Sequence, residues 1–381
     1  MMKIYKKAIL PKDFKANGIA SGIRKLKKLD LALLYSNIPA KASCLFTTNK
    51  IQAAPIRVTK QYLKKNKYFQ AIIINSGNAN CFTGKAGIKD AEEVARTLAS
   101  ILKIKKESIL VFSTGIIGKR LPVPKIKKAI PELVRGLSAG GIAKAKQAIM
   151  TTDTFAKEVT VKLDIAGRRV TLCGIAKGAG MIAPDMATML GFILADANIT
   201  HNALRKALKI AVANSFNCIT VDGCMSTNDT VAILANASCG NVLIDSDSGK
   251  YFNLFVKALS LVCLELAKMI VRDAEGATKF IQIKIGEAKN FSEAKKAALS
   301  IANSNLFKTA VYGENPNFGR IVAALGASGI DLKEKDLKIK VSPLNKKEIN
   351  VYVSLKRGNY SAIVYTSDLT PGYIKINAEY N

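Results

Sequence analysis

The sequence predicts an α+β protein built around a layered mixed sheet, and three observations support this prediction. Apolar and polar residues alternate over residues 158–165, 280–285 and 349–355, as in strands with one buried face. Segments with helical periodicity lie between such strands, in no regular βαβ order. The 381 residues are enough for two domains or for one large layered domain.

The remaining elements follow in order along the chain. A buried strand is expected at residues 71–80, where the apolar start of "AIIINSGNAN" leads into a turn of Gly and Asn. Apolar residues recur at helical spacing in residues 89–104, 142–150, 201–216, 251–272 and 292–303. Thr200 precedes the third of these helices and is a suitable N-cap, because its hydroxyl can accept a backbone N–H of the first turn.

The segment "KGAGMIAPDMATMLGFILADA", residues 177–197, carries conflicting signals near the middle of the chain. Its residues alone favour a glycine turn followed by a buried helix with Thr188 packed inside. The pattern Gly178-x-Gly180-x-x-Ala183, with Asp196 downstream, also imitates a dinucleotide-binding fingerprint. No βαβ unit surrounds this pattern, so we disfavour a dinucleotide site.

The same segment permits a chemical interpretation. A Thr within a chain can attack the carbonyl of the preceding residue when a strained backbone holds the two groups together. Attack of Thr188 on Ala187 would form an ester by an N→O shift, and hydrolysis would leave Thr188 with a free α-amine. Such an amine has a pKa of roughly 7.7–8.0 and can act as the base for its own hydroxyl. Gly178, Gly180 and Pro184 would supply the required geometry.

The inventory of reactive side chains narrows the chemistry further. His201 is the one histidine in the sequence and is expected at a helix start, where a surface or capping role is usual. A metal site built from several His ligands is therefore excluded, and a His-dependent nucleophile would need this residue. The seven Cys are scattered without a CxxC pattern, which favours reduced thiols in the core over disulfides or a zinc site.

The formal net charge of +30 is compatible with a nucleic-acid or anionic-membrane binder. However, only 11 of the 58 basic residues are Arg, the residue that reads bases best, and the Lys are spread along the whole chain. No apolar stretch approaches the ~18–20 residues of a membrane span, and the N-terminus does not resemble a signal peptide. We expect a soluble cytoplasmic protein without a nucleic-acid or membrane partner.

Ordered motifs occur along nearly the whole chain. They include "NSGNANCFTG" (75–84), "STGIIG" (113–118), "MTTDTFAK" (150–157), "KGAGMIAPDMATML" (177–190), "SFNCITVDGCMSTNDT" (215–230), "VRDAEGATKF" (271–280), "GENPNFGR" (313–320) and "INAEY" (376–380). In this order they resemble the motifs of the glutamate N-acetyltransferase (ornithine acetyltransferase) family of arginine biosynthesis. The resemblance implies a layered α+β fold of the ornithine acetyltransferase and N-terminal-nucleophile aminopeptidase-like type.

Family members cut themselves between an Ala and a Thr, here Ala187 and Thr188. The resemblance therefore implies an alpha fragment, residues 1–187, and a beta fragment, residues 188–381, that begins with the nucleophile. It further implies that Thr188 takes the acetyl group from N2-acetylornithine, releases ornithine and passes the group to glutamate, forming N-acetylglutamate. The family's oxyanion hole corresponds to Thr114 and Gly115, and a hydroxyl with a backbone N–H is a sensible pair of donors.

The family's substrate contacts correspond to Thr151, with Thr152 as the alternative, Lys177, Glu275 and Asn377. A Lys suits a substrate carboxylate and a Glu suits an ammonium group, and both substrates are amino acids. In "GENPNFGR" the polar residues Asn315, Asn317 and Arg320 are expected to support the site rather than to touch substrate.

The resemblance also implies a heterotetramer of two alpha and two beta fragments, with no metal and no bound organic cofactor. Some members use acetyl-CoA as a co-substrate for N-acetylglutamate synthesis, and no residue here decides that question. Two departures stand out. Asp185 replaces a common Asn, and the Thr or Ser that contacts substrate beyond the last motif has no counterpart before Asn381.

Two other functions remain open at this point. An N-terminal-nucleophile amidase or aminopeptidase would share the self-cleavage but would hydrolyse its acyl-enzyme. A basic nucleic-acid-binding protein would need no cleavage at all, and its retention on DNA would depend on salt.

Overall fold

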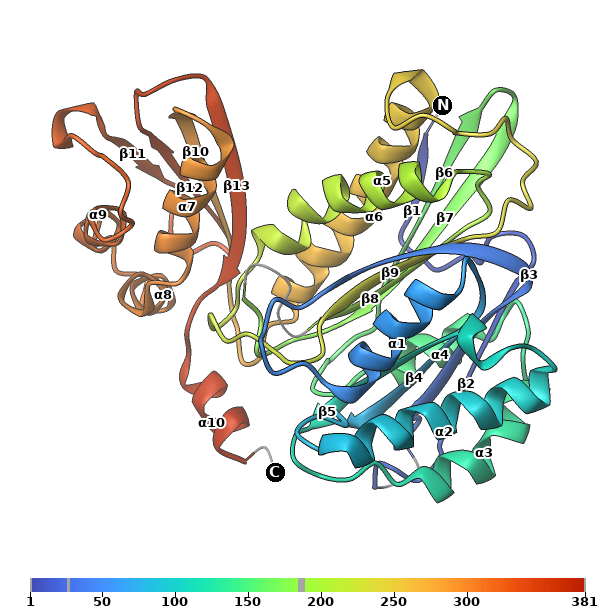
Figure 1. Cartoon of the computed structure of the whole chain (residues 1–381). Helices are drawn as coiled ribbons and strands as arrows, with labels where there is room; N and C mark the ends of the chain where they lie inside the picture. The colour runs from blue at the N-terminus through green and yellow to red at the C-terminus, as the bar shows by residue number, and fades with distance from the viewer. Residues whose placement is uncertain (1, 26–27, 184–188, 380–381) are drawn as a thin grey trace. The chain divides into compact units, whose positions relative to one another are not determined.

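The structure is a computed structural model that describes residues 2–25, 28–183 and 189–379 (Figure 1). Contacts within these residues divide the chain into two units. The first unit comprises Met1–Gly178, Asp185–Ser215 and Met225–Leu266. The second comprises Ala179–Pro184, Phe216–Cys224 and Ala267–Asn381. Neither unit coincides with the fragments 1–187 and 188–381, so that division of the chain remains a prediction.

The first unit is built on a mixed sheet that has nine strands in the described part of the chain. Their order is β1-β6-β7-β8-β9-β3-β4-β5, and β2 pairs with β3. The strands are β1 (Lys3–Tyr5), β2 (Phe14–Ile19), β3 (Leu31–Phe46), β4 (Tyr68–Asn78), β5 (Ile109–Ile116), β6 (Lys157–Ile165), β7 (Arg168–Lys177), β8 (Leu190–Ala195) and β9 (Thr230–Ala235). The pairs β4–β5 and β8–β9 are parallel.

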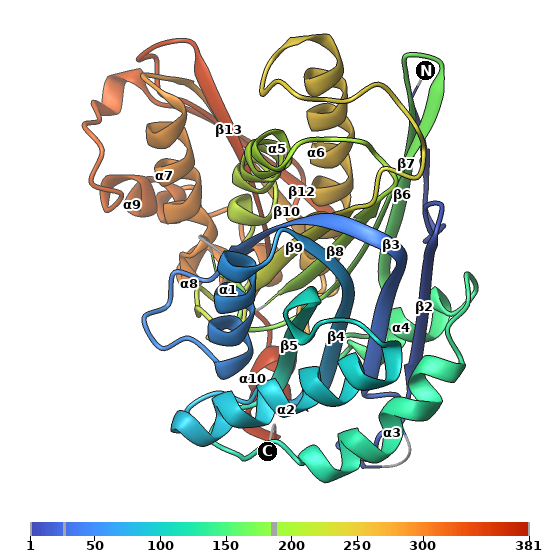
Figure 2. The same ribbon diagram turned by 45° about the vertical axis from the view of Figure 1, so that its right-hand side comes forward.

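Helices lie on both faces of this sheet. They are α1 (Ala54–Lys65), α2 (Gly84–Leu102), α3 (Val123–Arg135), α4 (Ile142–Ala148), α5 (His201–Ala213) and α6 (Gly249–Arg272), which continues into the second unit. In Figures 1 and 2, α5 and α6 lie on the side of β8 and β9 opposite to α1. Gly174 of β7 faces α6, since a Cβ there would lie 2.6 Å from Val262. Ile175, the next residue, packs into the core on the other face with residues of α1, α2 and α3.

The second unit holds a four-stranded sheet in the order β11-β12-β10-β13. Its strands are β10 (Phe280–Ala288), β11 (Lys338–Val341), β12 (Glu348–Ser354) and β13 (Tyr360–Ser367), and its helices are α7 (Phe291–Ala302), α8 (Asn305–Tyr312), α9 (Gly319–Gly326) and α10 (Pro371–Glu379). Ile281, Ile283 and Ile285 of β10 share one core with Ala294 and Ala297 of α7. Short 3₁₀ helices occur at Lys106–Ser108, Phe216–Cys218 and Glu334–Asp336.

The predicted elements agree with the structure to within a few residues at their ends. The segments with alternation are β6, β10 and β12, the strand at 71–80 is β4, and the five helical segments are α2, α4, α5, α6 and α7. Thr200 caps α5 as expected, with its hydroxyl 3.4 Å from the backbone nitrogen of Ala203. The prediction of a layered α+β architecture is confirmed.

The helix expected after the glycine segment is wrong. Leu190–Ala195 form strand β8, which pairs with β7 on one side and with β9 on the other. Both faces of β8 are buried, so every residue is apolar or small and no alternation marks the strand. The dinucleotide fingerprint fails with it, because that motif requires a helix after its glycines.

The structure also bears on the class of protein. All seven Cys are free thiols, and Cys81, Cys173, Cys218 and Cys263 are buried, as expected for core residues. Among the described residues, no helix is long and apolar enough to cross a membrane. Over the same residues, no three His, Cys, Asp or Glu side chains are grouped so that they could hold a metal ion.

Candidate active site

The predicted oxyanion residues Thr114 and Gly115 lie at the end of β5, beside the end of β4. Gly115 has a φ of +135°, and a Cβ at this position would lie 2.3 Å from the carbonyl carbon of Gly77. Gly77 itself has a φ of +93°. The close approach of the two strands therefore depends on glycine at position 115, while Gly77 is favoured by its positive φ and by the contact that a Cβ there would make with Arg24. Thr114 is 5% exposed, so this turn places a hydroxyl in a buried setting.

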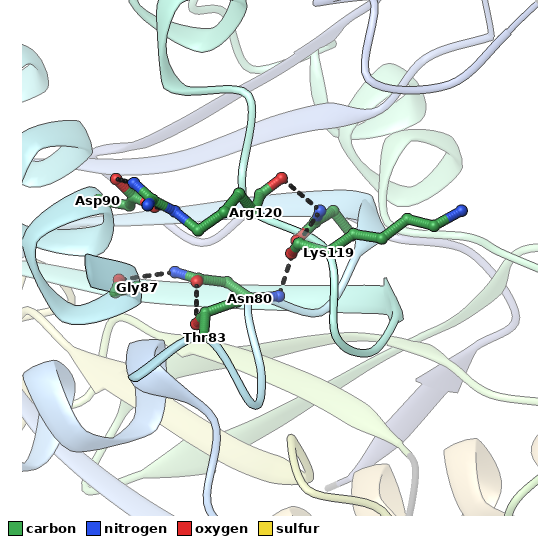
Figure 3. A network of polar contacts seen from close by, with 7 residues as sticks. Asn80, Thr83, Gly87, Asp90, Lys119 and Arg120 are labelled. Atoms are coloured by element: carbon green, nitrogen blue, oxygen red, sulfur yellow. Dashed lines mark hydrogen bonds and ion pairs between the residues drawn. The ribbon is translucent and has the colours of Figure 1, made fainter. Parts of the chain in front are cut away.

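A polar network holds the loop that follows β5 (Figure 3). The Asn78 side-chain amide donates to the carbonyls of Lys119 and Arg120, at 3.2 and 3.1 Å. The Arg120 guanidinium in turn donates to both carboxylate oxygens of Asp90 in α2, at 2.8 and 2.9 Å. Asn78 also accepts the backbone N–H of Asn80 at 2.8 Å. Asn78 thus connects the loop that follows β4 with the loop that follows β5.

Asn228, from the motif at residues 215–230, supports the same strand end from a distant part of the sequence. Its buried side-chain amide donates to the carbonyls of Ala79 and Ser113, both at 2.8 Å. The Ser113 hydroxyl donates to Asn75 at 2.6 Å. Ser113 directly precedes Thr114. Asn228 and Asn75 therefore hold the end of β5 that carries the predicted oxyanion residues.

Lys177 ends β7 and belongs to a buried charged cluster with Asp153 and Lys157. Asp153 accepts the backbone N–H of Gly178 at 2.7 Å and that of Thr151 at 2.9 Å. It also forms an ion pair with Lys157, and neither side chain of this pair is exposed. Asp153 therefore connects two predicted substrate-binding residues, Thr151 and Lys177, that lie far apart in the sequence.

The charges of this cluster determine the ionisation of Asp153. Burial alone would raise the pKa of Asp153, but the charges of Lys177 and Lys157 outweigh it, and the N–H of Gly178 adds to their effect. Together they lower the pKa of Asp153 to about 2. Asp153 is thus ionised at neutral pH, between the ammonium groups of Lys177 and Lys157.

A groove lies beside one of the two Thr residues that the resemblance left open. A groove of about 410 Å³ is lined by Thr151 together with Arg24, Met150 and Asp153, among others. Thr152 does not line it. The Arg24 guanidinium donates to the carbonyls of Met150 and Thr151, at 2.9 and 3.3 Å, and thereby holds this part of the groove wall.

In the second unit, Glu275 and Asn377 lie together. The Asn377 side-chain amide donates to Glu275 at 2.9 Å. The Glu275 carboxylate also lies over Gly180, where a Cβ would be 2.2 Å from one of its oxygens. Gly180 is therefore needed for close packing against Glu275 rather than for binding a phosphate.

Asp222 is a second organising carboxylate of the second unit. It accepts the backbone N–H groups of Met181, at 2.6 Å, and of Ile182, at 3.0 Å. It also accepts the hydroxyl of Tyr373 in α10 at 3.1 Å. Burial and the nearby charge of Asp222 raise the pKa of Tyr373. Asp222 thus holds the segment that leads towards Ala187 and the helix that carries Asn377.

The residues of "GENPNFGR" form a separate feature. Asn315, Asn317 and Phe318 line a mostly apolar pocket of about 250 Å³ between α8, α9 and the β11–β12 turn. Arg320 donates to the hydroxyl of Thr309 at 3.2 Å and to a carbonyl of α8. These contacts lie within the second unit and provide no evidence for a role at the site.

The remaining predicted site residues, Ala187 and Thr188, lie outside the described residues, as does Asp185. The structure adds residues to which the sequence interpretation gave no role: Asp153, Asp222, Asn228 and Asp229. All four belong to the quoted motifs, but their partners are mostly main-chain groups, which leave no trace in a sequence. The sequence offered one indication of their roles: each is an acidic or amide residue within a polar loop motif.

Comparison with known proteins gives the family. The chain matches the ArgJ family over residues 15–381. The chain belongs to the ArgJ family. It is 46% identical to the arginine biosynthesis bifunctional protein ArgJ of Caldanaerobacter subterraneus, over 97% of each chain. It is also 41% identical to the mitochondrial ArgJ protein of Dictyostelium discoideum, over 97% of this chain and 92% of that one.

Solved structures of ArgJ proteins are also similar to this chain. The crystal structure of ornithine acetyltransferase from Mycobacterium tuberculosis, complexed with ornithine, contains a chain that is 36% identical to this one. That match has a TM-score of 0.45 and covers 48% of this chain and 98% of that chain. An ArgJ chain from Bacillus halodurans gives a TM-score of 0.46, also at 36% identity, over 49% of this chain and all of that one.

Proposed function

We propose that this ArgJ-family chain is an acyltransferase of arginine biosynthesis that moves the acetyl group of N2-acetyl-L-ornithine to L-glutamate. The products are ornithine and N-acetylglutamate. The observation that carries this proposal is the family match over residues 15–381, which spans every motif that bears a predicted site residue. The bifunctional arginine biosynthesis proteins at 41–46% identity support it.

Self-cleavage of the chain precedes the acetyl-transfer reaction. The Thr188 hydroxyl attacks the Ala187 carbonyl, the peptide nitrogen leaves as the Thr188 amine, and water hydrolyses the resulting ester. The hydroxyl of Thr188, with its α-amine as base, then attacks the acetyl carbonyl of N-acetylornithine. Ornithine leaves, and the acetyl-Thr188 ester passes its acetyl group to the amine of glutamate. Thr114 and Gly115 stabilise the oxyanion of each tetrahedral intermediate.

The charges of the site residues suit amino-acid substrates. Lys177, whose charge acts on the neighbouring Asp153, attracts the substrate α-carboxylate, and Thr151 offers a hydroxyl in the groove that Asp153 also lines. Thr152 is the weaker candidate for that contact. Glu275, oriented by Asn377, suits the side-chain ammonium group of ornithine. No step of this chemistry requires a metal or a bound organic cofactor.

We further propose that the cleaved enzyme assembles as a heterotetramer of two alpha and two beta fragments and works in the cytoplasm, with neither membrane nor nucleic acid as a partner. Acetyl-CoA would serve only as an alternative acetyl donor. Because relatives are named as bifunctional proteins, acetyl-CoA should be tested as an acetyl donor.

The decisive experiment is an intact-mass measurement of the purified protein, combined with an assay of acetyl transfer. We expect two species, residues 1–187 and 188–381. Thr188→Ala should remain one chain without activity, since it lacks both nucleophile and α-amine at the cut, and Thr188→Ser should still cleave, more slowly. A wild type found as one intact, fully active chain would refute the mechanism.

Substrate pairs separate transfer from hydrolysis. With N-acetylornithine and glutamate, we expect N-acetylglutamate and ornithine in equal amounts. With N-acetylornithine alone, ornithine should appear only in proportion to enzyme, as the acetyl-enzyme accumulates. Steady release of acetate and ornithine without glutamate would instead identify an N-terminal-nucleophile amidase.

A further inference from the structure

Met189, the residue that follows Thr188, is held at both of its main-chain groups. Its N–H donates to a carboxylate oxygen of Asp229 at 2.7 Å, and its carbonyl accepts the N–H of Thr230 at 3.1 Å. Directly afterwards β8 pairs in parallel with β9, with Leu190 opposite Thr230. The N–H of Met189 belongs to the peptide bond that Thr188 forms through its own carbonyl carbon. Any shift of this N–H therefore shifts the carbonyl end of Thr188.

The main chain and the side chain of Asp229 are both buried within the fold. Asp229 is 1% exposed, and its backbone carbonyl accepts the N–H of Thr47 at 2.9 Å. The preceding residue, Asn228, holds the carbonyl of Ser113, next to Thr114. Two consecutive side chains, Asn228 and Asp229, thus hold the strand end that carries the predicted oxyanion residues and the peptide after the predicted nucleophile.

A carboxylate is a notable partner for this N–H. Burying a carboxylate costs solvation free energy unless hydrogen bonds compensate it. The acceptor oxygen of Asp229 therefore holds the N–H of Met189 from a buried position.

We propose that Asp229 is a positioning residue for Thr188. By holding the Thr188–Met189 peptide, it aligns Thr188 for attack on Ala187 and, after cleavage, for attack on the acetyl donor. In this role Asp229 acts through its hydrogen bond with Met189, and the proton stays on the nitrogen of Met189. The inference rests on the proposed function, because that function makes Thr188 the nucleophile.

The test uses the full-length protein with Asp229→Ala, Asp229→Asn and a matched control, Asp196→Ala. Asp196 follows the other end of β8, is 4% exposed, and accepts the N–H of Thr171 at 2.7 Å. Asp196 is thus also a buried carboxyl group that accepts a backbone N–H of the same sheet. It follows the C-terminal end of β8, whereas Met189 precedes the N-terminal end. Intact mass gives the cleavage rate and the cleaved fraction, and steady-state kinetics per cleaved enzyme give kcat and KM for N-acetylornithine.

Asp229→Ala should cleave and turn over roughly 10–100-fold more slowly, the usual cost of a small misplacement of a reacting group, with KM nearly unchanged. Asp229→Asn keeps an acceptor oxygen and should recover most of both rates. Asp196→Ala should lower the unfolding temperature while its cleavage and kcat stay close to those of the wild type.

Two results would overturn the inference alone. In one, the wild type cleaves and transfers acetyl groups, but Asp229→Ala behaves like Asp196→Ala. In the other, Asp229→Asn is as slow as Asp229→Ala, so that the acceptor oxygen is not what matters. A wild type that neither cleaves nor transfers would refute the proposed function, and the inference with it.

Discussion

Thr114 carries a hydroxyl that is buried, yet it lies in a turn whose shape comes from glycines and asparagine amides rather than from Thr114 itself. Its removal should therefore affect chemistry more than folding. Thr114→Ala should lower kcat by roughly 10²–10³-fold, the usual loss for one oxyanion donor, and should also slow self-cleavage. Thr114→Ser retains a hydroxyl and should keep most of both activities. Turnover and processing by Thr114→Ala at wild-type rates would remove Thr114 from the mechanism.

Asp153 should contribute stability that depends on pH. Its pKa falls from an ordinary value near 3.8 to about 2 in the folded protein. A lowered carboxyl pKa stabilises the fold fully above the unfolded pKa, and this contribution disappears as the pH falls through the folded pKa. Stability from Asp153 should thus be present above about pH 4 and decline between about pH 4 and pH 2.

Asp153→Asn tests this directly. At neutral pH the substitution should lower the free energy of unfolding by about 3–5 kcal/mol, because two buried ammonium groups lose the carboxylate that faces them. Urea unfolding of wild type and variant across pH should show a difference that shrinks below about pH 4. The control is Asp164→Asn, which changes an exposed residue near the end of β6 and should show little effect. A difference for Asp153→Asn that does not vary with pH would contradict the assignment.

At the scale of elements, the ends of β4 and β5 depend on the closeness of Gly77 and Gly115. Gly118, in the loop after β5, also has a positive φ, but a Cβ there would have no atom within 4 Å. A comparison of alanine substitutions at Gly115 and Gly118 therefore separates the effect of backbone strain from that of a steric clash. Alanine at either position suffers the strain of a left-handed conformation, roughly 1–2 kcal/mol. Only alanine at Gly115 would push the strands apart.

We accordingly expect Gly115→Ala to reduce kcat by roughly 10²-fold or more, since it displaces the predicted oxyanion donors. Gly118→Ala should lower the unfolding temperature by a few degrees and leave kcat nearly intact. Thermal unfolding and steady-state kinetics on both variants provide the comparison. Equal losses of kcat in the two would mean that loop strain, not the approach of β4 and β5, governs the site.

At the scale of the whole molecule, the net charge of +30 remains the most conspicuous number. Among the described residues, Arg24 and Arg120 use their guanidinium groups to hold loops. Only 11 of the 58 basic residues are Arg, so the excess of positive charge comes mainly from Lys, which are dispersed along the chain.

Binding to DNA should therefore be weak and should disappear at physiological salt, where the Debye length is roughly 8 Å. Fluorescence anisotropy with labelled duplexes of different sequence, measured across salt concentrations, would test this. Submicromolar, sequence-selective binding at physiological salt would show that the charge serves a nucleic-acid partner after all.

The sequence by itself determined the elements whose two faces differ. Strands β6, β10 and β12 bury one face, so their residues alternate, and helices α2, α5 and α7 show helical periodicity for the same reason. The ordered motifs were sufficient to identify the family, because residue type and spacing are what a resemblance compares. Thr114 and Gly115 were predicted in this way as oxyanion residues, without any knowledge of their neighbours.

Only the tertiary structure decided the rest. β8 is buried on both faces, so nothing in its composition separates it from a buried helix, and its pairing with β7 and β9 is what makes it a strand. Asp153, Asp222 and Asp229 act on backbone N–H groups that lie about 25 to 40 residues away along the chain. A backbone N–H is the same at nearly every residue, so a sequence cannot say which one a carboxylate will meet. The fold decides that, and with it which acidic residues hold the site together.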